Sequence, residues 1–239
     1  MERENKIDFD FNDFREEGLY LIFPDSSRMA LTRDHVQGVT REYWADPRKI
    51  PEEVKHAVDF QRCPFCPLKG QDDFCDALRP ILPFFEVMDK YVSFDRVTAV
   101  YSDAGRNLFH IADTNMQNAL RFVSTMSLMQ YCQIGRKYWR YYLGISPLAA
   151  GPAAAERLFL NIYWDHKGDM ARIRNTISTF NGQIEVTADN QIKRLNLICR
   201  NDAFMNAFVN THTMLILLDL DIESALARAF DEFKKRIPL

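Results

Sequence analysis

Two cysteines separated by two residues constrain the folding of this chain more than any other feature. The segment Cys63-Pro64-Phe65-Cys66 places two sulfur atoms on one tight turn, and Cys75 follows shortly after it. A CxxC turn brings two thiols within reach of a single metal ion, and a third cysteine nearby supplies another ligand. The proline after each of the first two cysteines restricts the turn, so less conformational entropy is lost when a metal closes it. The pattern predicts a metal site and identifies no reaction.

A structural zinc site usually has four ligands, and Cys63, Cys66 and Cys75 supply three. The candidates for the fourth ligand are Cys132, Cys199, His56 and His110. We favour Cys132, because the apolar helix expected to carry it can pack back onto the cysteine turn. Thiolates suit zinc and iron–sulfur clusters equally well, and Cys-Pro sequences also occur in iron–sulfur ligation, so the sequence leaves the metal open.

Two other interpretations of the cysteines stay open. Free cysteine is commonly buried, so these residues could be small hydrophobic members of the core. They could also form a reactive thiol pair, since Cys75 lies near an expected helix N-terminus, where the helix dipole stabilises a thiolate. A thioredoxin-like pair would need a βαβ context, which the surrounding sequence lacks.

The composition excludes several classes of protein. Of the 239 residues 47% are hydrophobic and 26% charged, as in an ordinary globular protein with a sizeable core. A formal charge of −3 gives no overall reason to expect nucleic acid or an anionic membrane as a partner. Residues 1–6 are charged and precede no apolar signal core, and the apolar run 213–218 is too short to span a bilayer. We therefore expect a cytoplasmic protein, with no membrane span and with a protein as its partner.

Alternating apolar residues and turn sequences predict strands in the first half of the chain. The expected strands cover residues 7–11, 19–23, 29–31, 92–101 and 108–111. Pro24-Asp25-Ser26-Ser27 predicts the turn of a first hairpin, and Asp103-Ala104-Gly105-Arg106-Asn107 predicts that of a second. Residues 40–51 are expected to be irregular, because Trp44, Pro47 and Pro51 interrupt any periodicity.

The remaining segments show helical periodicity, most of it in the second half. The expected helices cover residues 114–135, 153–164, 169–180, 192–199, 203–218 and 224–235. A further helix after Asp72 or Asp73 should kink at Pro80 and Pro83 or be divided into two short helices, and a short helical or extended piece runs from Val54 to Phe60. The fold class is α+β, predominantly helical, with β hairpins in the N-terminal half. Residues 1–50 form a small β unit and residues 51–239 a second unit, unless the two are one continuous domain.

Cations and aromatics alternate in one segment that could be a second functional surface. Its residues are Arg136, Tyr138, Trp139, Arg140 and Tyr142. Such mixtures stack nucleic-acid bases or form protein interfaces, but we favour aromatic core anchors beside a solvated edge, and a protein interface if the segment is functional. His212 is expected to be a hydrogen-bonded core residue, and Asp165-His166 has neither a nucleophile nor a metal ligand beside it.

The cysteine turn resembles that of an uncharacterised bacterial family known only as a domain of unknown function. The similarity lies in Phe60 to Leu68, Cys75, Phe94-Asp95-Arg96-Val97 and Met126 to Cys132, and in the C-terminal stretches 202–209 and 219–226. The resemblance implies that Cys63, Cys66, Cys75 and Cys132 belong together, and it implies no activity. The chain departs from the family pattern at Gln133, where a proline is usual, and at Tyr142, near a histidine position.

These observations lead to two hypotheses. The first is a non-enzymatic cytoplasmic regulatory or assembly module with a structural zinc site of four cysteines. The second is an iron–sulfur redox or sensor protein that uses the same cysteines. The sequence patterns of phosphate-binding loops, dinucleotide-binding folds, metalloproteases and serine hydrolases are all absent, and no residue is predicted to be catalytic.

Overall fold

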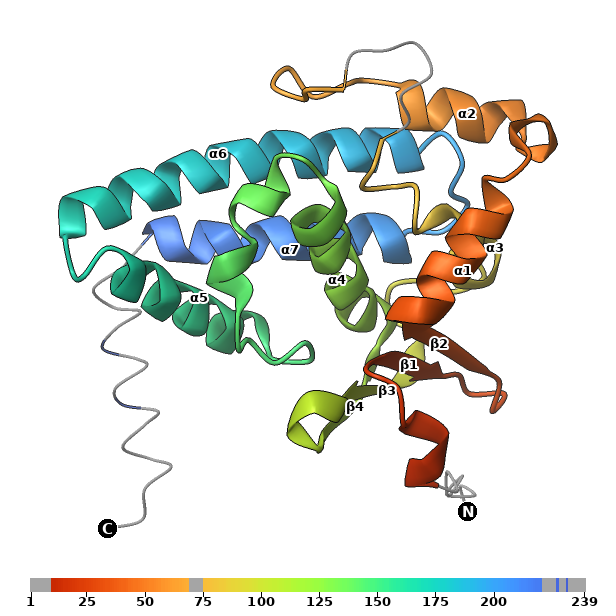
Figure 1. Cartoon of the computed structure of the whole chain (residues 1–239), viewed down its shortest axis with the longest axis horizontal. Coiled ribbons are helices and arrows are strands. Elements are labelled where there is room, and N and C mark those ends of the chain that lie inside the picture. Colours follow the sequence, from red (N-terminus) through yellow and green to blue (C-terminus); the bar gives the residue numbers. More distant parts are fainter. Residues whose placement is uncertain (1–9, 69–74, 221–226, 228–230, 232–239) are drawn as a thin grey trace.

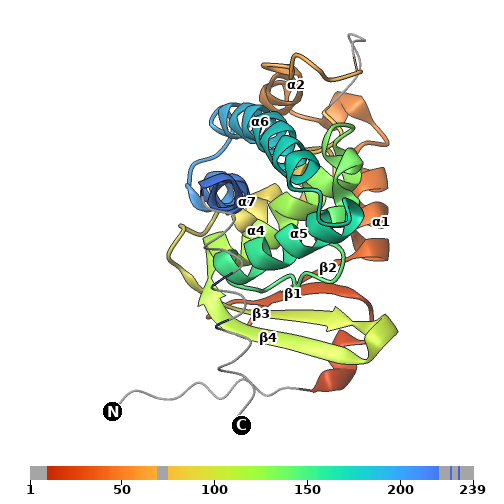
Figure 2. The same ribbon diagram turned by 90° about the vertical axis from the view of Figure 1, so that its left-hand side faces the viewer.

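A four-stranded antiparallel sheet lies against a layer of helices in the computed structural model (Figures 1 and 2). The structure describes residues 10–68, 75–220, 227 and 231. The strands are β1 (Gly18–Ile22), β2 (Arg28–Thr32), β3 (Arg96–Asp103) and β4 (Leu108–Asn115). The α-helices are α1 (Arg33–Tyr43), α2 (Glu52–Asp59), α3 (Phe85–Met88), α4 (Met116–Met126), α5 (Gly151–Asp165), α6 (Met170–Leu195) and α7 (Ala203–Leu220). The predicted class, a predominantly helical α+β fold with hairpins in the N-terminal half, is confirmed.

Strand β1 holds the sheet together, because it pairs antiparallel with both β2 and β3 in the order β2-β1-β3-β4. Gly18 lies opposite Thr32 on one side and Ser102 on the other. Both predicted hairpins form, β1 with β2 and β3 with β4. The sheet therefore joins strands from both of the predicted units, residues 1–50 and residues 51–239.

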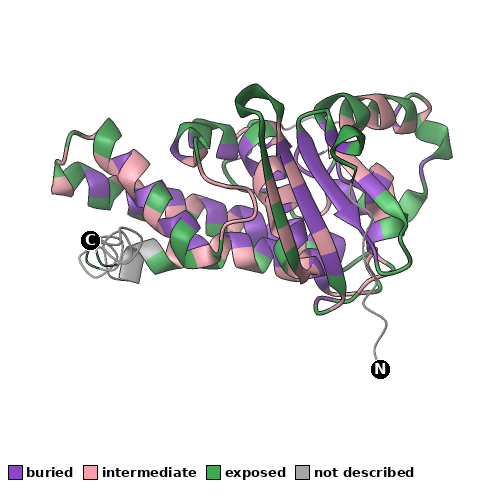
Figure 3. Cartoon of the chain, turned by 90° about the horizontal axis from the view of Figure 1, so that it is seen from below, coloured by how far each residue is buried: buried purple, intermediate pink, exposed green. Residues whose placement is uncertain are grey.

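Both faces of β1 are buried, and Figure 3 shows the strand as a buried band in the middle of the sheet. Leu19 and Leu21 face the main core beneath the helices. Tyr20 and Ile22 point the other way, where Phe14 covers them and packs edge-on against Tyr20 with ring centroids 5.1 Å apart.

Residues 11–14 form a short 3-10 helix, so the strand expected over residues 7–11 is wrong for Phe11, and residues 7–9 lie outside the described residues. The carboxylate of Asp10 accepts a hydrogen bond from the Asn12 N–H at 2.9 Å, and this cap starts the 3-10 turn in place of a strand. The turn places Phe14 over the outer face of β1.

Helix α1 was not predicted, since its C-terminal part falls in the segment expected to be irregular. The Thr32 hydroxyl caps it by accepting a hydrogen bond from the His35 N–H at 3.4 Å. The helix buries no residue completely, and only partly buried side chains such as Val36 and Val39 reach the core. Most of its residues are polar, so the segment offers few apolar residues from which a helix could be recognised.

The helix expected to run from residue 72 to residue 85 is interrupted. Residues 76–81 form turns, Leu82–Phe84 form a 3-10 helix, and only Phe85–Met88 are α-helical. Pro80 and Pro83 lack the N–H that a continuous helix needs. Residues 69–74 lie outside the described part of the chain.

Helix α4 passes into a π-helical turn, Ser127–Tyr131, which ends at Cys132; we call these five residues the π turn. The predicted cap was Thr114, but Thr114 lies in β4 and Asn115 caps the helix. Gly135 packs directly on the π turn: a Cβ atom there would lie 2.0 Å from the Leu128 carbonyl oxygen. Only glycine allows this approach, so the π turn and Gly135 define each other's position.

Helix α6 is continuous where two helices and a break at Asn181-Gly182 were expected. Asn181 contributes to packing, since its side-chain oxygen lies 3.1 Å from Nε2 of His212 on α7. The predicted hydrogen bond of His212 is confirmed, although that residue is only partly buried. Tertiary packing here outweighs the poor helix propensity of Asn and Gly.

Helix α7, predicted over residues 203–218, contacts α4, α5 and α6 and lies between α5 and α6 in Figure 1. A buried hydrogen bond of 2.6 Å joins the hydroxyls of Ser124 on α4 and Thr211 on α7. The helix expected over residues 224–235 lies almost entirely outside the described residues. No described helix is both long enough and apolar enough to cross a bilayer.

Two glycine-to-alanine substitutions should have opposite effects on the free energy of unfolding. Gly135→Ala should lower it by about 2–3 kcal/mol, because the new methyl group overlaps the backbone of the π turn. Gly182→Ala should raise it by about 0.5–1 kcal/mol, because nothing lies within 4 Å of the added Cβ in α6. Urea denaturation of both variants measures the two changes, and a neutral Gly135→Ala would contradict the close approach.

Candidate metal centre

The cysteine turn begins where α2 ends. The N–H of Phe60 closes the last turn of the helix on the His56 carbonyl, and Gln61 then adopts a left-handed conformation with φ of 52°. This reversal leads the chain into Cys63-Pro64-Phe65-Cys66, where the Cys66 N–H donates to the Cys63 carbonyl at 2.9 Å. The two cysteines are thus held on one tight turn, as the sequence predicts.

Four cysteines from three separate segments line one small cavity. Cys63 and Cys66 lie on the turn after α2, Cys75 lies at the start of the turns that lead to α3, and Cys132 follows the π turn. Cys63 and Cys132 are buried, whereas Cys66 and Cys75 are half-buried. The cavity has a volume of about 30 Å³, which admits an ion or a water molecule but no organic substrate.

The sulfur atoms do not form a closed ligand set in this arrangement. Among residues 10–68 and 75–220, no group of three or more His, Cys, Asp or Glu side chains is placed so that it could hold a metal ion. The four thiols share a cavity, and small rotations of their side chains would be needed for all of them to reach one ion.

Every one of these sulfur atoms accepts a hydrogen bond from an N–H group. The backbone N–H of Leu68 donates to Cys66, and those of Ile134 and Gly135 donate to Cys132. The side-chain amide of Asn190 donates to Cys63 at 3.4 Å. Neutral thiols are weak acceptors, and sulfur accepts several N–H groups well only when it carries negative charge.

Cys75 receives two side-chain hydrogen bonds, and both come from α6. Gln191 Nε2 and Arg194 Nη1 each lie 3.2 Å from its sulfur. The other amide atom of Gln191, Oε1, is buried and has no hydrogen-bond partner in the described part of the chain. These donors and Asn190 lie on one buried face of the last turns of α6, at positions 190, 191 and 194.

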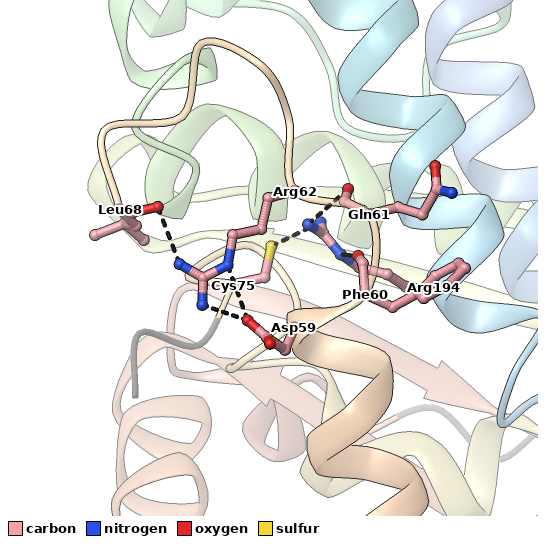
Figure 4. Close-up of polar contacts among 7 residues, drawn as sticks. All are labelled: Asp59, Phe60, Gln61, Arg62, Leu68, Cys75 and Arg194. Carbon is pink, nitrogen blue, oxygen red and sulfur yellow. Dashed lines mark hydrogen bonds and ion pairs between the residues drawn. The ribbon is translucent and has the colours of Figure 1, made fainter. Parts of the chain in front are cut away.

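Arg194 is a buried cation with an unusual set of partners (Figure 4). Its guanidinium donates to the carbonyl of Phe60 at 2.7 Å and to that of Gln61 at 3.1 Å. It forms no ion pair with a carboxylate among the residues that the structure describes. Buried charges are normally paired, and Cys75 Sγ is the contacting atom that can carry a negative charge.

A second arginine holds the cysteine turn closed. Arg62 pairs with Asp59 at the end of α2 and donates through Nη1 to the Leu68 carbonyl at 3.2 Å (Figure 4). The residues before and after the turn are thereby connected through one side chain. This contact limits the opening of the turn and keeps the sulfurs of Cys63 and Cys66 near the cavity.

Burial controls the protonation of two of the thiols. It raises the pKa of Cys132 to about 11, and it also raises the pKa of Cys66, while the N–H donors act in the opposite direction. Both thiols are therefore protonated near neutral pH when no metal is present. A metal ion that binds here must displace these protons.

The other candidates for a fourth ligand lie elsewhere. Cys199 is near Asp89, and burial raises its pKa to about 12. His56 stacks near the Phe60 ring with centroids 5.6 Å apart, and His110 on β4 contacts the Ser146 hydroxyl at 3.3 Å. None of these three lines the cavity, and Cys132 does.

The predicted surface at residues 136–142 divides between core and solvent. Tyr138 is buried and stacks on Phe180 at 4.2 Å between centroids, and the Tyr142 hydroxyl is buried as well. The favoured interpretation, aromatic core anchors, is therefore confirmed for these two residues, and packing against Phe180 of α6 excludes them from the alternative interface patch. Arg136, Trp139 and Arg140 are exposed.

The Asp165-His166 pair has structural contacts. Asp165 pairs with Arg140 at 3.0 Å, and Nε2 of His166 lies 2.8 Å from the hydroxyl of Thr176 on α6. The nearby Asp169 caps α6. These contacts join the end of α5 to the segment 140–141 and to α6.

Sequence reasoning missed the polar residues of α6. Asn190, Gln191 and Arg194 stand among the apolar residues 184, 188 and 195, all of which are buried on the same helix. Polar residues on an apolar helical face are a signal that could have drawn attention to them. Their partners could not have been found in this way, since more than a hundred residues separate them from the cysteines.

Comparison with known proteins does not assign this chain to a family. No family model, curated protein or solved structure matches this chain. The resemblance to a bacterial family with the same cysteine pattern therefore stays a prediction that depends on the residues themselves.

Replacing Arg194 should weaken metal binding more than it weakens the fold. We expect Arg194→Gln to lower zinc affinity roughly 10- to 100-fold, the usual effect of removing a partner that contacts a metal ligand. Arg174→Gln is the matched control, since Arg174 lies on an exposed position of the same helix. Competition with a chromophoric chelator measures both affinities, and equal affinities would contradict a role for the buried guanidinium.

Proposed function

We propose that this protein is a non-enzymatic regulatory or assembly module whose fold is completed by one zinc ion on Cys63, Cys66, Cys75 and Cys132. The observation that carries the proposal is the set of N–H donors directed at all four sulfurs. Such a set stabilises thiolates, which are the metal-binding form of cysteine. Neutral thiols in an ordinary core do not require such a set of N–H donors.

The charge of the site supports the same proposal. Four thiolates around a divalent zinc ion leave an excess of negative charge, which is costly in a buried place. Arg194 supplies a positive charge next to Cys75. The amides of Asn190 and Gln191 and the backbone N–H groups distribute the remaining charge.

The size of the cavity favours a single ion over a cluster. A volume of about 30 Å³ suits one zinc ion, whereas an iron–sulfur cluster would have to displace the surrounding side chains. The role of the ion is structural: four protein ligands leave no open coordination position for a substrate. The ion would connect three segments that are separate in the sequence: the turn after α2, the turns before α3 and the end of the π turn.

Two observations support a function in protein assembly: the small size of the cysteine cavity and the types of residue exposed on the surface. The cysteine cavity is too small for an organic substrate. The exposed residues Arg136, Trp139 and Arg140 belong to the residue types that dominate protein interfaces. We propose that they contact a protein partner.

Metal analysis of the purified protein tests the site directly. We expect about one zinc per chain in the wild type and in Cys199→Ser, and much less in Cys66→Ser, because Cys199 does not line the cavity. Cys66→Ser should also lower the thermal midpoint, since a structural metal in excess stabilises its folded state by roughly 4 kcal/mol at a thousandfold excess over Kd.

Three outcomes of this experiment would contradict the proposal in different ways. Normal zinc content in Cys66→Ser would place the ion elsewhere. Iron, sulfide and visible absorbance in anaerobically purified wild type would support the iron–sulfur alternative. If the purified protein contains no metal and gains no stability when zinc is added, the four cysteines are ordinary core residues.

The pH dependence of stability should differ between zinc-loaded and metal-free protein. Protons compete with zinc for the thiols, so the stabilisation by zinc should decrease as the pH falls from 8 to 5.5. In metal-free protein the pKa of Cys132 is raised to about 11, above its unfolded value of roughly 8.5. Its contribution to stability is therefore complete below pH 8.5 and is lost as the pH rises towards 11.

Thermal unfolding at a series of pH values, with zinc and with chelator, measures both trends. Cys132→Ala is the control for the alkaline trend, because Tyr101 also titrates late, with a pKa raised to about 12 by burial. The same acid trend with and without zinc would contradict metal binding.

A further inference from the structure

The π turn that ends at Cys132 also forms a wall of a second, larger cavity. This cavity has a volume of about 590 Å³ and opens to solvent beside α1 and α4, which lie on the same face of the sheet (Figure 1). Its volume falls within the usual range for small-molecule sites, about 300–1,000 Å³. Residues from β1, α1, the turns before α3, α4 and the π turn contribute to its lining.

The inner surface of this cavity is apolar. Ile81, Phe84 and Met88 are buried in the core and reach it from one side. Phe122 and Met126 of α4 reach it from another. Methionine side chains are flexible and polarizable, so such a wall adapts to a chain-like apolar ligand.

The cavity also presents two cationic side chains that have no partner among the described residues. Arg33 and Arg136 both line it, and neither guanidinium makes a hydrogen bond or an ion pair within residues 10–68 and 75–220. One carboxylate, that of Glu17, also lines the cavity, and it accepts a hydrogen bond of 3.4 Å from the Tyr101 hydroxyl. Two arginines and one glutamate leave an excess of positive charge beside an apolar interior.

The polar groups next to the arginines are suited to the head group of a ligand. Tyr131 lies near Arg33 and lines the cavity together with Arg136 and Gln130. Trp139, with 53% of its surface exposed, stands beside Arg136. Tyrosine and tryptophan suit places where an apolar region meets a polar one. The cations, the amide and the aromatic rings therefore line the same cavity as the apolar side chains.

We propose that this cavity binds an aliphatic carboxylate of the fatty-acid type, with the chain against Phe84, Met88 and Met126 and the carboxylate against Arg33 and Arg136. The planar guanidinium pairs with a carboxylate through two hydrogen bonds, which gives the charged end a defined position. The proposal is independent of the metal on the cysteines, although the π turn that lines this cavity leads directly into Cys132.

Decanoate and its neutral analogue decanol are the probes for this site. Trp139 reports binding, because a chain that enters the cavity should shift the emission of its half-exposed indole to shorter wavelength. We expect saturable binding of decanoate below its micellar concentration, roughly tenfold tighter than decanol. Shortening the chain by one methylene should weaken binding about fourfold.

The double variant Arg33→Gln/Arg136→Gln separates the charge contribution from the apolar one. It should bind decanol as the wild type does and should bind decanoate no better than decanol. Lys137→Gln is the matched control, since this exposed neighbour of Arg136 does not line the cavity. Trp139→Phe should abolish the fluorescence change, and isothermal calorimetry should still detect binding by that variant.

Four results would overturn the proposal. The first is the absence of saturable binding to folded wild type, and the second is equal affinity for decanoate and decanol. The third is an undiminished preference for decanoate in the double variant. The fourth is a concentration-dependent dimer that decanoate dissociates, which would make a second copy of the chain the occupant of the cavity. Thermal unfolding of each variant confirms that lost binding is not lost folding. Repeating the titration after chelation shows whether binding is independent of the metal.

Discussion

The buried guanidinium of Arg194 is the contact on which the arrangement around the cysteines depends. It reaches from α6 to the carbonyls of Phe60 and Gln61 and to the sulfur of Cys75 (Figure 4). A buried cation is costly unless every donor is satisfied and a negative charge is near. These contacts fix the end of α2 and the segment of Cys75 against one face of α6. The cavity of the four cysteines lies where these elements meet.

The π turn is the second constraint: it lines the larger cavity, and Cys132 of the smaller cavity follows it directly. It ends α4 at Met126, and the backbone N–H groups of Ile134 and Gly135 then point at the sulfur of Cys132. The contact between Gly135 and Leu128 leaves no room for any side chain at position 135. Helical irregularities of this kind are frequent at functional sites, because they place side chains where a regular helix cannot. Here one irregular turn positions a proposed metal ligand and part of an apolar binding wall.

The two proposed sites would have different roles in the fold, one structural and one in ligand binding. A structural ion would complete the packing around α2 and α6, next to the hydrogen bonds that join Phe60, Gln61 and Cys63 to α6. The larger cavity, whose two arginine side chains have no partner among the described residues, has the volume and the mixed polarity that a small ligand needs. A ligand there would contact the π turn, and so would influence the same backbone that holds Cys132.

The sequence by itself determined the local features. Alternating apolar residues and turn sequences identified both hairpins, apolar periodicity identified α5, a largely apolar segment identified α7, and the CxxC spacing identified the turn that carries Cys63 and Cys66. These signals arise from residues near one another in the chain. Tertiary structure alone decided that α6 continues through Asn181-Gly182, that the largely polar segment of α1 forms a helix, and that Asn190, Gln191 and Arg194 contact the cysteines. The physical reason is that burial against distant elements outweighs local propensity, and a single sequence does not record which distant elements meet.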